Sequence, residues 1–438
     1  MRMTLKRSLL AAAVAAAVAP GVALATNGYF AHGYGTKNKG MAGAGVALPQ
    51  DSMAAATNPA GMVWVGDRMD LGAAIFSPHR EYTVTGNPQM GDTFALEPGK
   101  VESDSDYFLI PHFSRNWMLD GQSSFGVAVY GNGGMNTDYP GHANPVRNAG
   151  GMCPSGTYCG GPTGVDLMQL FVAPTYSRKV NDSASWGVSA ILAAQTFEAR
   201  GLGPFAGFSS DGSKLSNNQH ETSFGAGLRL GIQGEVSPGL TLGAAYTSEI
   251  QMGELDDYAG LFAEQGDFDI PASATVGLAF RPNDRSAVTF DIQRIWYSKV
   301  KSVGNSMLPA LGACGMGVTS QCLGTDAGSG FGWDDMTIYK LGYQWQTGPE
   351  WTWRVGVSHG DQPIPDSEVV FNILAPAVME THVTFGFTKQ MGRDQELNFA
   401  AMYAPSNDVS GANPLAGDQR VKLEMEQFEL EASWAWRF

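Results

Sequence analysis

The sequence has no run of about 18 or more apolar residues beyond position 25, so it predicts no membrane-spanning helix in that part of the chain. Charged residues are also scarce, at 16% of the chain, which is low for a soluble surface. These absences do not predict a soluble protein. In a transmembrane β-barrel only alternate residues face lipid, so the strands give a weak hydropathy signal.

Catalytic and metal-binding motifs are missing as well. There is no His-Glu-x-x-His motif and no Walker A motif, and the seven histidines have no metal-ligand spacing. The segment 356–360 matches Gly-x-Ser-x-Gly, but it lies inside an alternating strand pattern with no helix after it, whereas a hydrolase needs a strand-to-helix elbow. We therefore predict no catalytic residue, no metal and no cofactor.

Only four cysteines are present, and they form two close pairs. Proximity favours the local disulfides Cys153–Cys159 and Cys314–Cys322 in an exported chain. A zinc site is the alternative, but neither pair has Cys-x-x-Cys spacing and neither has a histidine close by.

Residues 1–25 have the features of a secretory signal peptide. A basic start precedes an Ala-rich apolar run, Pro20 breaks it, and Ala23 and Ala25 form an Ala-x-Ala cleavage site. A membrane anchor is the alternative, but the run is short and weakly apolar. Cleavage removes three basic residues and no acidic one, so the net charge of −15 becomes about −18. This charge argues against a nucleic-acid partner.

Glycine is abundant, with 56 residues, and aromatic residues make up 11% of the chain. From about residue 67 onward, apolar residues alternate with polar or small ones, for example over 339–346 and 351–358. Such a period of two is typical of strands with one apolar face. The last strand, over 421–438, alternates in the same way and ends in Phe438, as outer-membrane barrels commonly do.

The alternating pattern divides into fourteen segments, many of them longer than a typical soluble strand. The segments are 67–80, 104–119, 122–135, 165–180, 183–201, 219–237, 239–253, 268–282, 285–304, 332–348, 350–362, 376–391, 394–405 and 421–438. Short and long connections alternate between them, as tight periplasmic turns and larger outer loops do in outer-membrane barrels. The chain is therefore predicted to be all-β, with a 14-stranded antiparallel transmembrane β-barrel over residues 67–438. We expect a monomer, because a closed barrel leaves no strand edge to pair.

Residues 26–66 lack this alternation and are rich in glycine and alanine. The segment is too short to form a domain with its own core. A disordered periplasmic arm and a plug, or hatch, inside the barrel lumen are the two alternatives. The low charge and small side chains favour the hatch.

The same segment carries a family resemblance. It contains residues 27–33 (Asn-Gly-Tyr-Phe-Ala-His-Gly), a Gly/Ala run at 40–47, Asp51, and the motif Asn58-Pro59-Ala60-Gly61. Together with the segment 130–137 it resembles the FadL-like outer-membrane transporters of long-chain fatty acids. The architecture of the whole chain agrees with that family, but only these two segments resemble it closely.

The resemblance implies passive transport across the outer membrane of a Gram-negative bacterium, without ATP or proton coupling. Ligand is bound near the outer surface, moves to a tighter inner site, and leaves sideways into the membrane where the third strand is kinked. Some relatives admit monoaromatic hydrocarbons instead. The expected partners are a hydrophobic ligand, outer-membrane lipid and lipopolysaccharide.

Candidate residues follow from the pattern and the resemblance together. The hatch motif 58–61 and Asp51 are predicted to hold or gate the hatch. The glycine-rich stretch Gly131, Asn132, Gly133 and Gly134 is predicted to form the lateral gate, and the alternative is a strand that simply ends in a loop. The candidates for ligand contact are Tyr29, Phe30, His32, Arg200 and Arg229, the two arginines being interpreted as lumen-facing. Hatch packing and pairing with lumen acids are the alternatives for these five.

Two other function classes remain open from the sequence. A general porin or an adhesin is also a barrel, but porins usually lack an N-terminal hatch and conduct ions. A barrel lipase would need a Ser/His/acid set, which the sequence does not offer.

Overall fold

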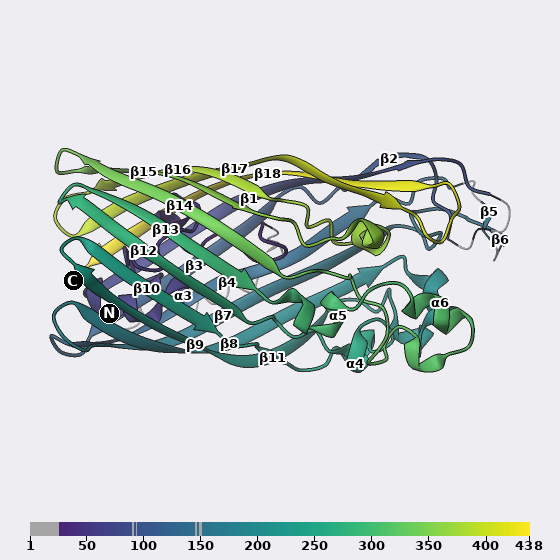
Figure 1. Ribbon diagram of the computed structural model, residues 1–438, viewed down its shortest axis with the longest axis horizontal. Helices are drawn as coiled ribbons and strands as arrows, with labels where there is room; N and C mark the ends of the chain where they lie inside the picture. The colour runs from purple at the N-terminus through teal and green to yellow at the C-terminus, as the bar shows by residue number, and fades with distance from the viewer. Residues whose placement is uncertain (1–25, 90–91, 93, 145–146, 149–150) are drawn as a thin grey trace, which may run out of the picture.

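The computed structural model describes residues 26–438 except 90–91, 93, 145–146 and 149–150 (Figure 1). The predicted signal peptide, residues 1–25, lies outside the described residues. In the described part, no helix is both long and apolar enough to cross a membrane.

Fourteen antiparallel strands among the described residues form one closed barrel. Neighbours in sequence pair with one another around the wall, and β18 pairs with β1 over 68–85 and 420–437 to close the ring. Short turns join the strands at one end and long loops join them at the other (Figure 1). The end with long loops is the cell exterior in outer-membrane barrels. The predicted fold class is confirmed.

The wall strands are β1 (Arg68–Thr85), β3 (Phe108–Met118), β4 (Ser123–Tyr139), β7 (Thr163–Lys179), β8 (Ala184–Arg200), β9 (Glu221–Ser237), β10 (Leu240–Thr247), β12 (Ser273–Asn283), β13 (Ser286–Ile295), β14 (Met336–Thr347), β15 (Trp351–Gly360), β16 (Thr381–Gln390), β17 (Gln395–Ala412) and β18 (Arg420–Arg437). Short additional strands are β2 (Gly99–Glu102), β5 (Arg147–Asn148), β6 (Gly151–Met152) and β11 (Gln251–Met252). The helices are α2 (Thr36–Lys39), α3 (Ala54–Thr57), α4 (Ala263–Gly266), α5 (Lys301–Gly304) and α6 (Ala310–Gly315). The 3-10 helices, of one or two turns, are η1 (Pro59–Trp64), η2 (Gly203–Phe208), η3 (Gly212–Lys214), η4 (Asp256–Tyr258), η5 (Tyr297–Lys299), η6 (Thr319–Gln321), η7 (Asp366–Glu368) and η8 (Phe371–Ile373).

Alternation along each strand separates a lipid-facing side from a lumen-facing side. On β9, Phe224 and Ile232 are 71% and 61% exposed, whereas the intervening Arg229 is 5% exposed. Large apolar side chains that would destabilise a soluble surface are thus suited to a hydrocarbon environment.

Several predicted strand limits were wrong. The segment predicted over 285–304 is a strand only to Ile295, and η5 and α5 follow. Val300 and Val303 are buried there at a spacing of three, which suits a helical turn and not a strand. Conversely, β17 continues to Ala412 and β1 to Thr85, so these strands extend into segments that were predicted to be loops.

Residues 26–66 lie inside the barrel, and we call this segment the hatch. α2 contacts β16, β17 and β18, whereas η1 contacts β4, β7, β8 and β9, so the segment spans the interior between different parts of the wall. Figure 1 shows this segment inside the barrel, toward the end with short turns.

Candidate functional site

Two buried lysines of the hatch pair with inward-facing carboxylates of the wall. Lys37 Nζ lies 2.6 Å from Glu396 on β17. Lys39 Nζ lies 2.7 Å from both Glu429 and Glu431 on β18. All five side chains are at most 6% exposed. Removing one partner of a buried ion pair is strongly destabilising, so these lysines fix α2 against this side of the wall.

Asp51 shapes the hatch itself. Its carboxylate accepts a hydrogen bond from Met53 N at 3.1 Å, and its carbonyl accepts from Ala54 N at 3.1 Å, at the start of α3. Burial, followed by the nearby Asp70 carboxylate, raises the pKa of Asp51.

Asn58 joins three parts of the structure. Its Nδ2 donates to Val46 O at 2.7 Å in the hatch and to Ile232 O at 3.0 Å on β9. Its Oδ1 accepts from Ala60 N at 3.1 Å and so caps η1, which Pro59 begins. This one side chain therefore ties the hatch both to itself and to the wall, and the Asn-Pro-Ala sequence makes that geometry possible.

Glycines of the barrel wall allow the hatch backbone around Asn58 and Pro59 to lie in close contact with the strands. A Cβ atom on Gly187 of β8 would collide with the backbone of Pro59, and one on Gly231 of β9 would collide with Asn58. Gly61 packs against Pro49, whose Cβ would lie 2.7 Å from an added Cβ. The hatch is thus held by close backbone contact on the side opposite its lysine pairs.

Gly187→Val is expected to displace the hatch, because overpacking a tight contact costs about 1–3 kcal/mol. Ion conductance in planar bilayers should rise about tenfold, which corresponds to about 1.4 kcal/mol. Gly121→Val is the matched control, since no atom lies within 4 Å of its added Cβ. Equal conductance of the two variants would show that this contact does not keep the hatch closed.

The hatch also pairs with an irregular part of β4. The register of β4 against β7 shifts around Asn132. There, Ala31 N donates to Asn132 O at 3.0 Å and Gly134 N donates to Tyr29 O at 3.0 Å. A Cβ on Gly133 would collide with the Tyr29 carbonyl, so glycine is required for this approach. The predicted gate residues therefore form a bulge that binds the hatch.

Next to this bulge the two strands β3 and β4 are not paired over part of their length, and we call this unpaired stretch the break in the wall. β3 begins at Phe108 and β4 extends to Tyr139, but the two strands pair only over 113–118 and 124–129. Above the break, Asp104 N donates to Asp138 O at 2.8 Å. Strand β4 does not end at its glycines, so the alternative of a strand running out into a loop is wrong.

Aromatic side chains of the hatch and of the outer loops pack together in one cluster. Tyr29 is its centre: its ring centroid lies 5.4 Å from Phe30, 5.2 Å from Tyr297, 6.0 Å from Trp333 and 6.1 Å from Phe268. All five residues are at most 5% exposed. Burial raises the pKa of the Tyr29 phenol well above its usual value, so the phenol stays neutral.

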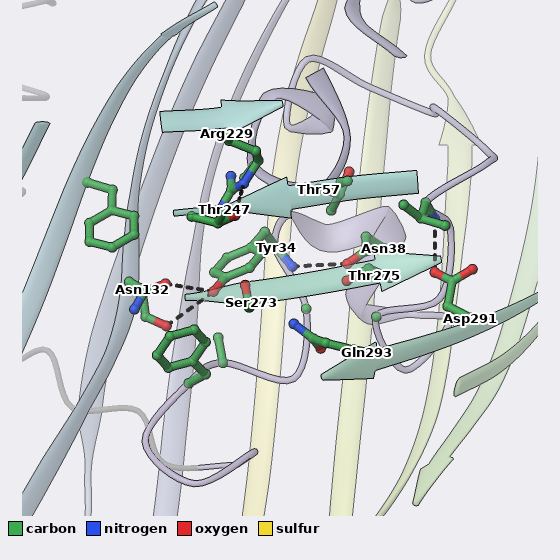
Figure 2. Close-up of a pocket in the computed structure, with 18 of the residues that line it drawn as sticks. Tyr34, Asn38, Thr57, Asn132, Arg229, Thr247, Ser273, Thr275, Asp291 and Gln293 are labelled. Atoms are coloured by element: carbon green, nitrogen blue, oxygen red, sulfur yellow. Dashed lines mark hydrogen bonds between the residues drawn. The ribbon is translucent and has the colours of Figure 1, made fainter. Parts of the chain in front are cut away.

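An inner cavity of about 50 Å³ lies between the hatch and the wall strands β9, β10, β12 and β13. This volume is well below the roughly 300–1,000 Å³ that is usual for ligand pockets, so the hatch or the lining side chains must move before a ligand of ordinary size binds here. Phe30 lines the cavity, but Tyr29 and His32 do not. Figure 2 shows polar side chains of the wall, among them Thr247, Ser273 and Gln293, around it.

Arg229 projects into this cavity from β9 (Figure 2). Its Nε donates to Thr247 Oγ1 at 2.8 Å, and its Nη1 donates to Ala55 O at 3.1 Å and to Tyr130 Oη at 2.9 Å. Within the described part of the chain, no carboxylate lies within ion-pair distance of Arg229. A buried cation without an anion is unfavourable, and Arg229 is one of the residues that line the inner cavity.

A second, apolar pocket lies under the outer loops. It has a volume of about 40 Å³, and none of its described lining residues is charged. The lining includes Tyr158, Phe197, Phe205, Phe262, Leu323 and Phe331. Phe262 contacts Phe268 of the aromatic cluster at 4.7 Å between ring centroids, so aromatic side chains continue from the outer pocket toward the inner cavity.

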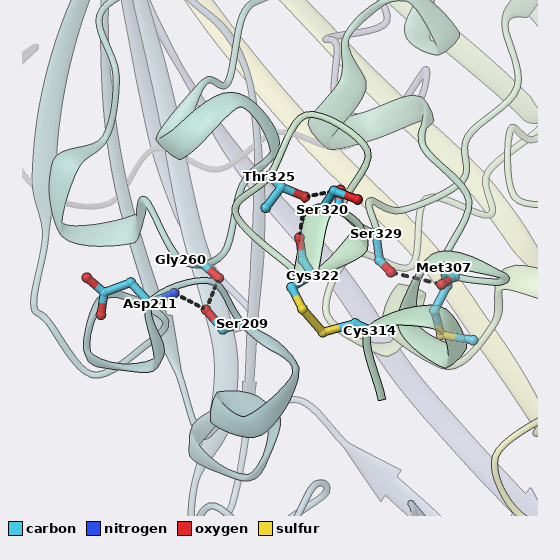
Figure 3. Close-up of a disulfide and its surroundings, with 9 residues drawn as sticks. All are labelled: Ser209, Asp211, Gly260, Met307, Cys314, Ser320, Cys322, Thr325 and Ser329. Carbon is cyan, nitrogen blue, oxygen red and sulfur yellow. Dashed lines mark hydrogen bonds between the residues drawn. A yellow bond between two sulfur atoms is a disulfide. The ribbon is translucent and has the colours of Figure 1, made fainter. Parts of the chain in front are cut away.

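The Cys314–Cys322 disulfide cross-links a loop beside this outer pocket (Figure 3). The adjacent Leu323 lines the pocket, and its carbonyl accepts from Ser210 N at 2.9 Å. The second disulfide, Cys153–Cys159, closes the loop that contributes Tyr158. Each disulfide thus restrains a loop that contributes residues to the lining of the pocket.

Replacing Cys314 and Cys322 together by serine is expected to loosen this loop. A short disulfide loop contributes about 2–3 kcal/mol, so proteinase K should cut the loop at least about tenfold faster in outer-membrane vesicles. The barrel should keep its heat-modifiable migration, since the strands are untouched. Unchanged cleavage would mean that packing alone orders the loop.

Several solved structures share the fold of this chain. The toluene transporter TodX from Pseudomonas putida is 18% identical with a TM-score of 0.65, over 93% of this chain and 99% of that chain. The toluene transporter TbuX from Ralstonia pickettii is 18% identical with a TM-score of 0.64, over 93% and 99%. A Pseudomonas aeruginosa FadL homologue is 16% identical with a TM-score of 0.66, over 94% and 100%. At these identities the likeness shows the shared fold. Comparison with curated proteins gives no match.

A model of the family described as outer membrane protein transport protein (OMPP1/FadL/TodX) matches residues 14–433. The chain belongs to this family. It is an outer-membrane transporter of hydrophobic compounds, and this family consists of channels and not of enzymes.

The structure separates the two arginines that were predicted to face the lumen. Arg229 does so, but that interpretation was wrong for Arg200. Buried and exposed residues alternate along β8, and Arg200 shares the outward face with Glu198. Its Nη2 lies 3.2 Å from Asp138, which leaves the guanidinium paired on the outer rim.

His32 is buried between the hatch and the wall. Its ring stacks on His382 of β16 at 5.9 Å, and its carbonyl accepts from Lys340 Nζ at 3.0 Å. Burial, followed by the nearby Lys39, lowers the pKa of His32, so the ring is neutral at ordinary pH. These contacts agree with a packing role.

Proposed function

We propose that this chain of the OMPP1/FadL/TodX family carries long-chain fatty acids, or similar amphiphiles with an anionic headgroup, into the outer membrane. The observation that carries the proposal is Arg229, a buried cation that lines the inner cavity and has no carboxylate partner among the described residues. A hydrogen-bonded carboxylate matches a guanidinium in charge and shape.

The outer pocket supports capture of the acyl chain. Its lining is apolar and aromatic, and each buried CH₂ group contributes about 0.8 kcal/mol. The ligand then passes the aromatic cluster, which must move because its rings are in contact, and its headgroup reaches Arg229. In this proposal Tyr29 and Phe30 contact the ligand and also change position as it passes.

The exit in this proposal is the break between β3 and β4. The absence of paired backbone there allows lateral release into lipid, and hatch residues Tyr29 and Ala31 bond to β4 beside the break. Deleting Asn132 removes the extra residue that shifts the register of β4 against β7. A straightened β4 should then continue to pair with β3 beyond Val129 and close the break. Uptake should then fall at least about tenfold, while unchanged uptake in a folded barrel would exclude this exit.

A second candidate is uptake of monoaromatic hydrocarbons. The cluster around Tyr29 favours it, because stacked aromatic rings bind one another beyond their simple burial. The solved relatives TodX and TbuX are described as toluene transporters.

Labelled oleate and labelled toluene, given to cells that lack their own fatty acid transporter, distinguish the two candidates. Oleate uptake that depends on this chain supports the fatty acid proposal. Uptake of toluene alone supports the second candidate. If neither enters while the barrel is folded in the membrane, both proposals are wrong.

A further inference from the structure

A row of buried side chains crosses the inner wall from the hatch to an outer loop. Tyr34 Oη donates to Asn132 Oδ1 at 2.8 Å, and Asn132 Nδ2 donates to Gln169 Oε1 on β7 at 3.0 Å. Gln169 Nε2 donates to Gln195 Oε1 on β8 at 3.3 Å, and Gln195 Nε2 donates to Phe268 O at 3.0 Å. We call this row the amide chain. Figure 2 shows its first link, between Tyr34 and Asn132.

All the hydrogen bonds of the amide chain point the same way. Each amide accepts through its oxygen from the preceding member and donates through its nitrogen to the next one. Gln169 and Gln195 are at most 1% exposed, so neither can exchange a lost partner for bulk water. A head-to-tail row in a buried site strengthens each of its bonds. It also fixes which way every amide is turned.

One end of the amide chain binds the hatch. Asn132 belongs to the β4 bulge, and its Oδ1 and its carbonyl accept from Tyr34 Oη and Ala31 N of the hatch. The Asn132 amide presents its oxygen to Tyr34 because its nitrogen is bound to Gln169. If that nitrogen lost its acceptor, the side chain would be free to turn.

The other end of the chain meets the aromatic cluster. Gln195 Nε2 donates to Ser223 Oγ at 3.2 Å and, over the shorter distance of 3.0 Å, to the carbonyl of Phe268. The Phe268 ring contacts Tyr29 at 6.1 Å and Phe262 at 4.7 Å. Phe262 lines the outer pocket. A ligand that shifts Phe268 on leaving that pocket therefore also disturbs the final bond of the amide chain.

We propose that Gln169 and Gln195 are positioning residues of a latch, which orient Asn132 to hold the hatch edge until a ligand moves Phe268. Only the trigger of the latch, the movement of Phe268 by a ligand, depends on the proposed function. The closed state that it maintains is independent of which ligand is carried, so the two can fail separately.

The test measures basal ion leak in planar bilayers with the full-length mature protein and no ligand. Gln169→Met and Gln195→Met keep side-chain length but remove the hydrogen bonds. Each should raise the leak about three- to tenfold, the equivalent of one buried hydrogen bond. Gln233→Met is the matched control, because Gln233 is a buried amide on the inward face of β9 outside the amide chain. Its leak should stay at the wild-type level.

Combination with Tyr34→Phe distinguishes a latch from local damage to the wall. Tyr34→Phe removes the bond that the latch controls, so adding Gln195→Met should raise the leak no further. Leaks that multiply in the double variant would overturn the latch. A leak from Gln195→Met no larger than that from Gln233→Met, with both barrels folded, would do the same.

The trigger is tested with oleate in the bath. In the wild-type protein oleate should raise the leak, whereas in Gln195→Met, which is already released, it should add little. If oleate has no effect on the wild type while the single and double variants behave as expected, the latch stands and the proposed ligand is wrong.

Discussion

Lys39→Met is expected to open the lumen to ions. The substitution keeps the length of the side chain but leaves Glu429 and Glu431 without the cation that lies 2.7 Å from each. Breaking a buried ion pair by removing one partner costs about 3–5 kcal/mol. That free energy falls on the contact between α2 and the wall, so the closed hatch loses most of its anchor on this side.

The measurable result is a rise in conductance of about two to three orders of magnitude in planar bilayers, since each 1.4 kcal/mol is tenfold. Cells should also become sensitive to large antibiotics that the outer membrane normally excludes. The control is the triple variant Lys39→Met, Glu429→Gln and Glu431→Gln, which removes the stranded charges together with the cation. Its conductance should return most of the way to the wild-type level. A Lys39→Met barrel that is folded and still closed would show that Asn58 and the glycine contacts hold the hatch without the lysine pairs.

The barrel could be predicted from the sequence because its signal is local. Strand alternation, turn residues and the alternation of short and long connections lie within a few residues of one another, and they follow from the two faces of a strand. The hatch could be placed because residues 26–66 break that pattern. The strand limits failed where a helical turn directly follows a strand, as at Val300, since a short apolar spacing does not distinguish the two.

The candidate site was predicted only in part, because its contacts join strands that are far apart in sequence. Glu429 is 390 residues away from Lys39, and nothing near either residue identifies the other as its partner. An acidic residue on the inward face of a strand, as at Glu429 and Glu431, was the available signal. The Gln169–Gln195 link of the amide chain is likewise visible only once adjacent strands are in register.

Arg200 shows how easily a facing assignment fails. Side chains alternate at every residue, so an offset of one moves a side chain from the lumen to the lipid face. In β8 the odd-numbered residues face inward, and Arg200 therefore faces outward beside Glu198. Arg229 has the inward parity in β9. The pair consequently provides an internal comparison, with one arginine on each face of the wall.

Arg229→Met should reduce oleate uptake about 10- to 100-fold at limiting oleate. Hydrogen bonds to a charged group contribute about 1.5–3 kcal/mol, and a carboxylate bound by Arg229 loses them together with the ion pair. Toluene carries no charge, so its passage, if it occurs, should be unchanged by this substitution. Arg229→Lys keeps the charge but not the planar fork, and we expect an intermediate effect.

The comparison with Arg200→Met decides how the result is interpreted. Arg200 lies on the outer rim and is paired with Asp138, so its loss should leave oleate uptake within about twofold of wild type, as for an exposed ion pair. Arg229 also bonds to Ala55 O of the hatch, and for this reason the ion leak of Arg229→Met must be measured beside uptake. Low uptake with wild-type leak assigns the effect to ligand binding, because the hatch is then still closed. Full oleate uptake by Arg229→Met would contradict the carboxylate site, and the apolar pocket and aromatic cluster would then favour a neutral ligand.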